Sequence, residues 1–305
     1  MNQYIQLTKR DCLLYIRDRG AIFFSLLSML ITLMLMGVFL GNMNVESVTD
    51  LLQEYGGVRD LKMDRENATH LVEYWTLAGI LVINAVTVTM TLMNNMVQDR
   101  ADRKLDSFYC TPIYKGVIAI SYVTSSVILG MLLCIVPFIL ALVYITARGG
   151  EMLSLSTIIK LLGCMFLNVV IFSVIMYLLA SLVKSRSAWS GLGTIIGTLV
   201  GFAGAVYLPM ESLPDKVGTV LKCLPILHGT SLMRKLCCKD MLEKTFSGLP
   251  EELSEGYSEA MGITISMGDS TVSSEFQVAF LLICGIIALG IATAVAVRHR
   301  TRTER

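Results

Sequence analysis

The stretch VIAISYVTSSVILGMLLCIVPFILALVYITA, residues 117–147, decides the fold of this chain. Its 31 residues include no Asp, Glu, Lys, Arg or His. An α-helix rises about 1.5 Å per residue, so roughly 20 apolar residues cross the hydrocarbon core of a bilayer, which is about 30 Å thick. The stretch is therefore long enough to span a membrane, and it predicts a transmembrane helix.

The rest of the chain has the same apolar character. Of its 305 residues, 54% are hydrophobic and 16% are charged, and the mean hydropathy is +0.66, whereas soluble domains carry about 25% charged residues. Runs of 18 or more residues with few or no charges predict six spans, at 22–40, 74–97, 117–147, 158–183, 190–208 and 276–297. The sequence thus predicts an all-α polytopic membrane protein, with one six-span transmembrane domain over residues 1–305.

The distribution of basic residues predicts how these spans are oriented. Fourteen of the 25 Lys and Arg lie in the N-terminal segment, the second-to-third connection, the fourth-to-fifth connection and the C-terminal tail. Asp and Glu predominate in residues 42–73 and 210–275. The positive-inside rule therefore predicts that both termini are cytoplasmic and that the two acidic segments are exterior. A net charge of +1 gives no reason to expect a nucleic-acid partner, and the expected surroundings are a lipid bilayer.

The chain offers little for catalysis. The interiors of the predicted spans hold no Asp, Glu, Lys, Arg or His, and only Lys160 lies near a span end, which disfavours ion-coupled carriers and proton relays. The sequence has no Gly-x-x-x-x-Gly-Lys phosphate loop, its three histidines lie outside any hydrolase motif, and its cysteines lack paired C-x-x-C spacing. We therefore expect no catalytic residue, metal or cofactor on this chain, so directed work would need a partner's energy.

Polar and small residues recur at helical spacing in two of the predicted spans. One stripe in the second span comprises Asn84, Thr87, Thr91, Asn94 and Asn95. Such a stripe supplies interhelical hydrogen bonds, a water-accessible path or a subunit interface, and the sequence does not choose among them. In the fifth span, Gly193, Gly197 and Gly201 form two G-x-x-x-G steps, which predict close helix packing within or between subunits.

A charged segment, QDRADRKLDSFYCTP at residues 98–112, lies between the second and third spans. Its composition predicts a short helix that ends at Thr111 and Pro112. We expect this helix to lie along the membrane and to present six charged side chains to the cytoplasm: Asp99, Arg100, Asp102, Arg103, Lys104 and Asp106. It would then either fit a protein surface below it or serve as a solvated loop that anchors the topology.

These features together resemble the membrane subunits of type-2 ABC exporters over nearly the whole chain. Such permeases begin with a basic helix on the membrane surface, matched here within residues 1–21, with Gln6, Arg10 and Arg17 on one face and Tyr4, Ile5, Cys12, Tyr15 and Ile16 on the other. Their second-to-third connection carries a charged helix that ends in Thr-Pro, although Phe108 and Tyr109 stand here where small aliphatic residues are usual. Beyond the fifth span, the pattern G-x-x-x-P-x-x-x-LP…LP…R is matched by Gly204, Pro209, Leu213-Pro214, Leu224-Pro225 and Arg234.

The resemblance implies the membrane-spanning subunit of an ATP-driven exporter in the plasma membrane of a bacterial cell. Two copies of this chain, or this chain and a related one, would join two separate ATPase subunits, which would bind ATP and Mg²⁺. Residues 98–116 would form the segment that couples to the ATPase, with Phe108 among its contact residues. Residues 209–236, with Pro209, Pro214, Pro225 and Arg234, would form re-entrant helices, and residues 237–275 an extracellular elaboration. The chain itself would have no nucleotide-binding domain.

The sequence is also consistent with two other classes of protein. A passive channel or pore would conduct without any ATPase. A membrane assembly scaffold would bind its partners and move nothing. The sequence does not identify a transported substrate.

Overall fold

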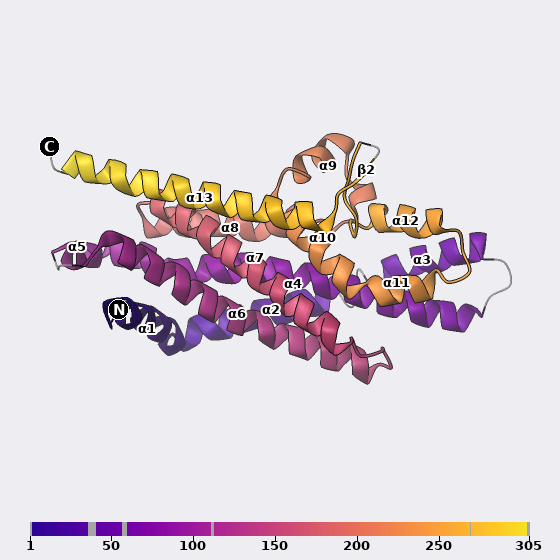
Figure 1. Cartoon of the computed structure of the whole chain (residues 1–305). Helices are drawn as coiled ribbons and strands as arrows, with labels where there is room; N and C mark the ends of the chain where they lie inside the picture. The colour runs from indigo at the N-terminus through magenta and orange to yellow at the C-terminus, as the bar shows by residue number, and fades with distance from the viewer. Residues whose placement is uncertain (1, 36–40, 57–59, 111–112, 269, 304–305) are drawn as a thin grey trace.

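The computed structural model describes residues 2–35, 41–56, 60–110, 113–268 and 270–303, which form an elongated bundle of helices (Figure 1). The elements in chain order are α1 (Asn2–Arg17), α2 (Arg19–Leu35), α3 (Gly41–Tyr55), α4 (Leu61–Ala101), α5 (Lys104–Tyr109), α6 (Lys115–Ala147), α7 (Leu155–Leu182), α8 (Arg186–Ala203), the 3₁₀ turn η2 (Met210–Ser212), α9 (Asp215–Leu221), α10 (Pro225–Cys237), α11 (Lys239–Thr245), α12 (Glu251–Ala260), β1 (Ser266–Met267), β2 (Ser270–Thr271) and α13 (Ser274–Thr303). The two short strands pair antiparallel.

Helix α4 is the central helix of the bundle. Asp60 caps its N-terminus by accepting from the backbone N–H of Lys62 at 3.0 Å and of Met63 at 3.4 Å. Its 41 residues make a helix roughly 60 Å long, which exceeds the thickness of a bilayer. It packs against α3, α6, α7, α8, α10 and α11, and its middle is almost wholly buried, with Trp75 and Leu77 among the largest core side chains.

Four of the six predicted spans coincide with helices that are long and apolar enough to cross a membrane. These helices are α4, α6, α7 and α13, the last over its residues Ser274–Val295. The predicted span 22–40 is covered by α2 only to Leu35, and residues 36–40 lie outside the described structure. The predicted span 190–208 corresponds to α8, which ends at Ala203 and has glycine at four of its 18 positions. The structure therefore supports an all-α membrane protein with four candidate spans among the described residues.

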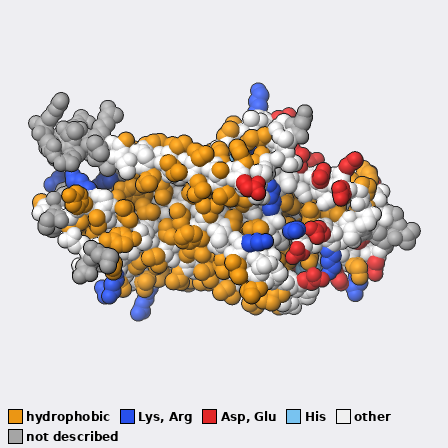
Figure 2. All heavy atoms as spheres, viewed as in Figure 1, with side chains coloured by type: hydrophobic (Ala, Val, Ile, Leu, Met, Phe, Trp, Pro, Cys, Tyr) orange, Lys and Arg blue, Asp and Glu red, His pale blue; other side chains and the backbone are white. Residues whose placement is uncertain are grey.

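The two ends of the bundle differ in charge. Helices α1 and α5 and the end of α13 lie at one end, and α3, α11 and α12 lie at the other (Figure 1). Figure 2 shows hydrophobic side chains over the middle of the visible face and Asp and Glu side chains gathered at the end that holds α3 and α12. We call the end that holds α1 and α5 the basic end, and the end that holds α3 and α12 the acidic end.

The segment after α8 folds back into the acidic half of the bundle. Pro209 precedes η2, Pro214 precedes α9, and Pro225 is the first residue of α10, where its missing N–H costs no helical hydrogen bond. Helix α10 packs against α4, α7 and α13. Helix α11 contacts α4, α12 lies at the acidic end, and β2 lies beside α9 (Figure 1).

Candidate functional site

The charged segment at the basic end forms a tight turn between α4 and α5. Helix α4 continues through Asp99 and Arg100 to Ala101, and the backbone N–H of Asp102 bonds to the carbonyl of Gln98 at 2.9 Å. Arg103 takes a left-handed conformation with φ of 58°, which breaks the helix and reverses the chain into α5. The expectation of one continuous helix from residue 98 is therefore wrong, and Thr111 and Pro112 lie outside the described residues.

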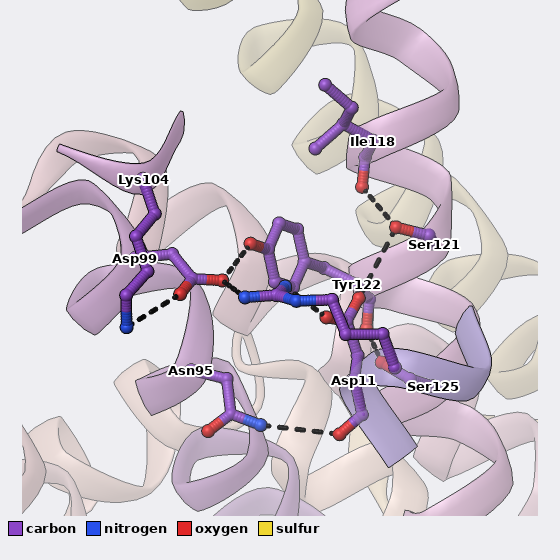
Figure 3. A network of polar contacts seen from close by, with 9 residues as sticks. Asp11, Asn95, Asp99, Lys104, Ile118, Ser121, Tyr122 and Ser125 are labelled. Atoms are coloured by element: carbon purple, nitrogen blue, oxygen red, sulfur yellow. Dashed lines mark hydrogen bonds and ion pairs between the residues drawn. The ribbon is translucent and has the colours of Figure 1, made fainter. Parts of the chain in front are cut away.

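Asp99 is the centre of a buried polar network (Figure 3). One of its carboxylate oxygens accepts from Arg10 Nη2 at 2.7 Å and from the Tyr122 hydroxyl at 2.6 Å. Lys104 Nζ lies 3.9 Å from the other oxygen. The network therefore joins α1, α4, α5 and α6, because each of the four residues comes from a different helix.

Asp11 extends this network along α1. Its carboxylate accepts from Arg10 Nη1 at 2.8 Å and from the Ser121 hydroxyl at 3.4 Å, and its backbone carbonyl lies 3.5 Å from Asn95 Nδ2. Burial raises the pKa of Asp11 to about 6, although the nearby Arg10 charge opposes that shift. Burial lowers the pKa of Arg10, but the hydrogen bond and the negative charge of Asp99 outweigh it, so the pKa is raised overall.

A second set of contacts ties the same turn to α7 and α8. Arg100 Nη1 donates to the carbonyls of Ala180 at 3.0 Å, Ser181 at 2.9 Å and Val183 at 3.0 Å. These belong to the last turn of α7 and its cap, where carbonyls lack partners within the helix. Asp102 pairs with Arg186, the first residue of α8, and with Lys104 at 3.3 Å.

The side chains that remain exposed on the turn are fewer than the sequence suggested. Asp99 was expected to face the cytoplasm, but it is only 3% exposed, because α4 carries it inward onto α1 and α6. Arg100 is half-buried against the end of α7. Asp102, Arg103 and Lys104 are exposed, as predicted. Phe108 is half-buried, and Cζ of Arg10 lies over its ring, 5.1 Å from the ring centroid. The side chain of Asp106 lies outside the described part of the chain.

The predicted polar stripe of α4 runs from a buried position to an open one. Asn84 is buried and its Nδ2 has no hydrogen-bond partner, Thr87, Asn94 and Asn95 are half-buried, and Thr91 is exposed. The threonine hydroxyls bond back to α4 itself, Thr87 to the carbonyl of Ile83 at 3.0 Å and Thr91 to that of Thr87 at 2.9 Å. Within the described residues, therefore, these two threonine side chains do not join α4 to a neighbouring helix.

The predicted glycine stripe of α8 lies close to another described helix at Gly193. A Cβ on Gly193 would lie 3.4 Å from Cε of Met90 in α4, whereas a Cβ on Gly197 would have nothing within 4 Å. A Cβ on Gly201 would meet the ring of Tyr207, which follows α8 directly. Within the described residues, therefore, the stripe lies against the Met90 side chain at Gly193, and no atom of the chain covers Gly197.

Arg234 holds together the segment in which the sequence placed Pro209, Pro214 and Pro225. Its fully buried guanidinium donates to the carbonyls of Ala205 at 2.7 Å and Met261 at 3.1 Å and lies 4.1 Å from the Trp75 ring centroid. Trp75 Nε1 donates to the same Met261 carbonyl at 2.8 Å. Arg234 therefore fastens α10 to α4 and to the ends of α8 and α12.

The sequence pattern does not mark several residues of these networks, and it places others on the wrong face of their helix. In α1 the buried positions are Leu7, Thr8, Asp11 and Tyr15, so Arg10 lies beside the packed face and not opposite it. In the sequence, Tyr122 indicates a buried polar contact here, because it places a hydroxyl near the start of an apolar span. No group of three His, Cys, Asp or Glu side chains able to hold a metal occurs among the described residues.

Comparison with known proteins places these features in a family. None of the curated proteins compared with the chain matched it. The family model described as ABC-2 type transporter matches residues 2–237, a range that runs from α1 to the end of α10. It includes the α4–α5 turn, the polar stripe, the glycine stripe and Arg234. The chain therefore belongs to the ABC-2 type transporter family as a membrane subunit.

Proposed function

We propose that this chain is the membrane-spanning subunit of an ATP-driven exporter, and that the α4–α5 turn couples it to a separate ATPase subunit. One observation carries the proposal: the turn is fastened by side chains to α1, α6, α7 and α8, while Arg103 and Lys104 stay exposed at its tip. A force applied at the tip therefore reaches four helices besides α4 and α5. A loop that only anchored topology would not need such connections.

The arrangement of the membrane domain follows from the same proposal. The basic end lies in the cytoplasm with both termini, the acidic end faces the exterior, and α2 and α8 complete six spans with the four candidate helices. Helices α9 and α10 re-enter the membrane from outside, and residues 237–275 form an extracellular elaboration. Two permease chains join two ATPase subunits, which bind ATP and Mg²⁺, and the cargo leaves the cell between the chains.

Purification of the tagged chain from its own cells in mild detergent tests the partnership. We expect an ATP-binding subunit to co-purify, and the complex to hydrolyse MgATP. Recovery of the chain without any ATP-binding protein, from cells that show no ATP-dependent transport, would contradict the exporter assignment.

Charge reversal at the exposed tip tests the coupling turn. Arg103→Glu combined with Lys104→Glu should reduce ATPase recovery and MgATP hydrolysis by the complex at least tenfold. The fold should survive, because exposed ion pairs and surface substitutions cost about 0.5 to 1 kcal/mol. Co-purification and hydrolysis rate are the measurements, and expression level reports folding.

A matched control reverses two exposed charges at the other end of α4. Lys62→Glu combined with Arg65→Glu makes the same change in net charge far from the turn. It should leave ATPase recovery unchanged. If both double variants recover equal amounts of the ATPase subunit, the turn only anchors the topology and does not couple to the ATPase.

A further inference from the structure

The acidic end contains a groove that plays no part in the proposed coupling. It has a volume of about 910 Å³ and lies between α3, the η2–α9 segment and α12. Pockets for small molecules fall mostly between about 300 and 1,000 Å³. The groove is therefore large enough to enclose most of a ligand of a few hundred daltons.

The wall of this groove is mainly apolar, and its charge is mainly negative. Leu51, Pro209, Leu213 and Ile265 are among the apolar lining residues. The charged lining residues are Glu211, Asp215, Glu252, Glu259 and Lys222. Glu259 accepts from the Ser266 hydroxyl, whereas Glu211, Asp215 and Glu252 have no ion pair within the described residues. Such a wall favours a ligand that combines an apolar body with positive charge.

A buried polar group gives independent reason to expect a ligand here. Asn44, on α3, lines the groove with only 8% of its surface exposed, and its Nδ2 has no hydrogen-bond partner. Tyr257, on α12, also lines the groove, and its buried hydroxyl likewise has none. A buried donor left without a partner costs about 1 to 3 kcal/mol, and Asn44 Nδ2 is closed off from the empty groove. Rotation of the Asn44 amide toward the groove would let an acceptor oxygen on a bound molecule remove that cost.

We propose that this groove binds an amphipathic cation of a few hundred daltons. Its positive charge would lie near Glu211 and Glu252, its apolar body against Leu51 and Ile265, and an acceptor oxygen near Asn44. The site lies at the end of the molecule opposite the α4–α5 turn (Figure 1). It therefore extends the proposed function by adding a ligand site that needs no ATPase.

Binding of two dyes of similar size and opposite charge tests the site. Rhodamine 6G is an amphipathic cation, and fluorescein is an anion at pH 7.5. Fluorescence anisotropy of each dye with the purified chain in a neutral detergent measures binding. We expect saturable binding of rhodamine 6G that weakens as NaCl is raised, and fluorescein should bind at least tenfold more weakly. Equal binding of both dyes, or no saturable binding of rhodamine 6G, would overturn the proposal.

Variants distinguish the groove from the detergent micelle. Glu211→Gln combined with Glu252→Gln should weaken rhodamine 6G binding roughly three- to tenfold, which corresponds to about 0.7 to 1.4 kcal/mol and is the size expected for two exposed charge interactions together. Glu255→Gln is the matched control, because Glu255 lies on the same helix α12 but does not line the groove. Asn44→Leu keeps the side-chain size and should also weaken binding. Wild-type affinity in the double variant would contradict the site. The assay contains no ATPase, so its result is independent of the coupling proposal.

Discussion

Two arginines, fully buried Arg234 and half-buried Arg10, hold the ends of the molecule by different chemistry. Arg234 is met by backbone carbonyls and the face of Trp75, and no carboxylate pairs with it among the described residues. Arg10 is met by two carboxylates, Asp11 and Asp99. Carbonyls do not titrate near neutral pH, but carboxylates can. The basic end is therefore the one whose network we expect to respond to pH.

Asp11 is the residue that carries this pH dependence. Its pKa is raised from 3.8 to about 6 by burial, so between those values the folded chain keeps a proton that the unfolded chain releases. The stability that this group contributes is present below about pH 4 and is lost as the pH rises through 6. Asp11→Asn should remove that dependence, which is on the order of 1 to 3 kcal/mol.

The measurement is the melting temperature of each purified variant between pH 4.5 and 7.5. The wild-type chain should lose stability relative to Asp11→Asn as the pH rises. Asp50→Asn, at an exposed carboxylate of α3, should track the wild type. A wild-type chain that instead gains stability relative to Asp11→Asn would show that pairing with Arg10 outweighs burial.

At the scale of the helix, the sequence predicts where the long apolar helices lie along the chain, but it does not predict which residues of other helices they contact. The apolar runs locate α4, α6, α7 and α13, because the length of a membrane span is set by the bilayer. The same runs do not show that α4 continues past residue 97, because charged residues such as Asp99 and Arg100 are typical of a cytoplasmic loop. In the fold, Arg10 and Tyr122 bind Asp99, and the end of α7 binds Arg100. The contacts of Arg10 with Asp99 and of Arg100 with Ser181 join residues 89 and 81 positions apart, and pairs that distant leave no pattern in a single sequence.

The same limit applies to the polar stripe, whose role depends on what covers α4. The open part of the stripe, at Thr87 and Thr91, faces either water, lipid or a second chain. Single cysteines in a background without native cysteines distinguish these cases. If the stripe lines a path, Thr91→Cys and Thr87→Cys should react with a water-soluble thiol reagent, and trapping ATP on the partner should change the rate.

Controls for this labelling come from the structure. Ile83, Val86 and Met90 are buried on the same helix and should be protected. Leu132 on α6 is 58% exposed on an apolar span, so Leu132→Cys should face lipid and react slowly despite its exposure. Reaction at Thr91→Cys no faster than at Leu132→Cys in every nucleotide state would rule out a path.

For the whole molecule, the open face of α8 points to assembly between permease chains. Gly197 lies on this face with nothing within 4 Å of its Cβ position. Ile195 and Leu199, which are 57% and 56% exposed, lie on the opposite side of the helix, because two positions along an α-helix turn by about 200°. Small residues let helix backbones approach closely in a membrane, where apolar surface alone gives no preference for a partner helix over lipid. The side of α8 that carries Gly197 is therefore better suited to a second helix than the side that carries Ile195 and Leu199 is.

Gly197→Trp tests this interface, because the indole fits the open space of one chain and fills the space that a second chain would occupy. We expect native mass spectrometry of the purified complex to show a loss of at least tenfold in species with two permease chains. Ile286→Trp is the control, since Ile286 is 68% exposed on α13, where Gly285 and Gly290 are five positions apart and form no G-x-x-x-G step. If Gly197→Trp and Ile286→Trp both keep two permease chains per complex, α8 faces lipid, and the chains must meet along another surface, of which the open stripe of α4 is the nearest candidate.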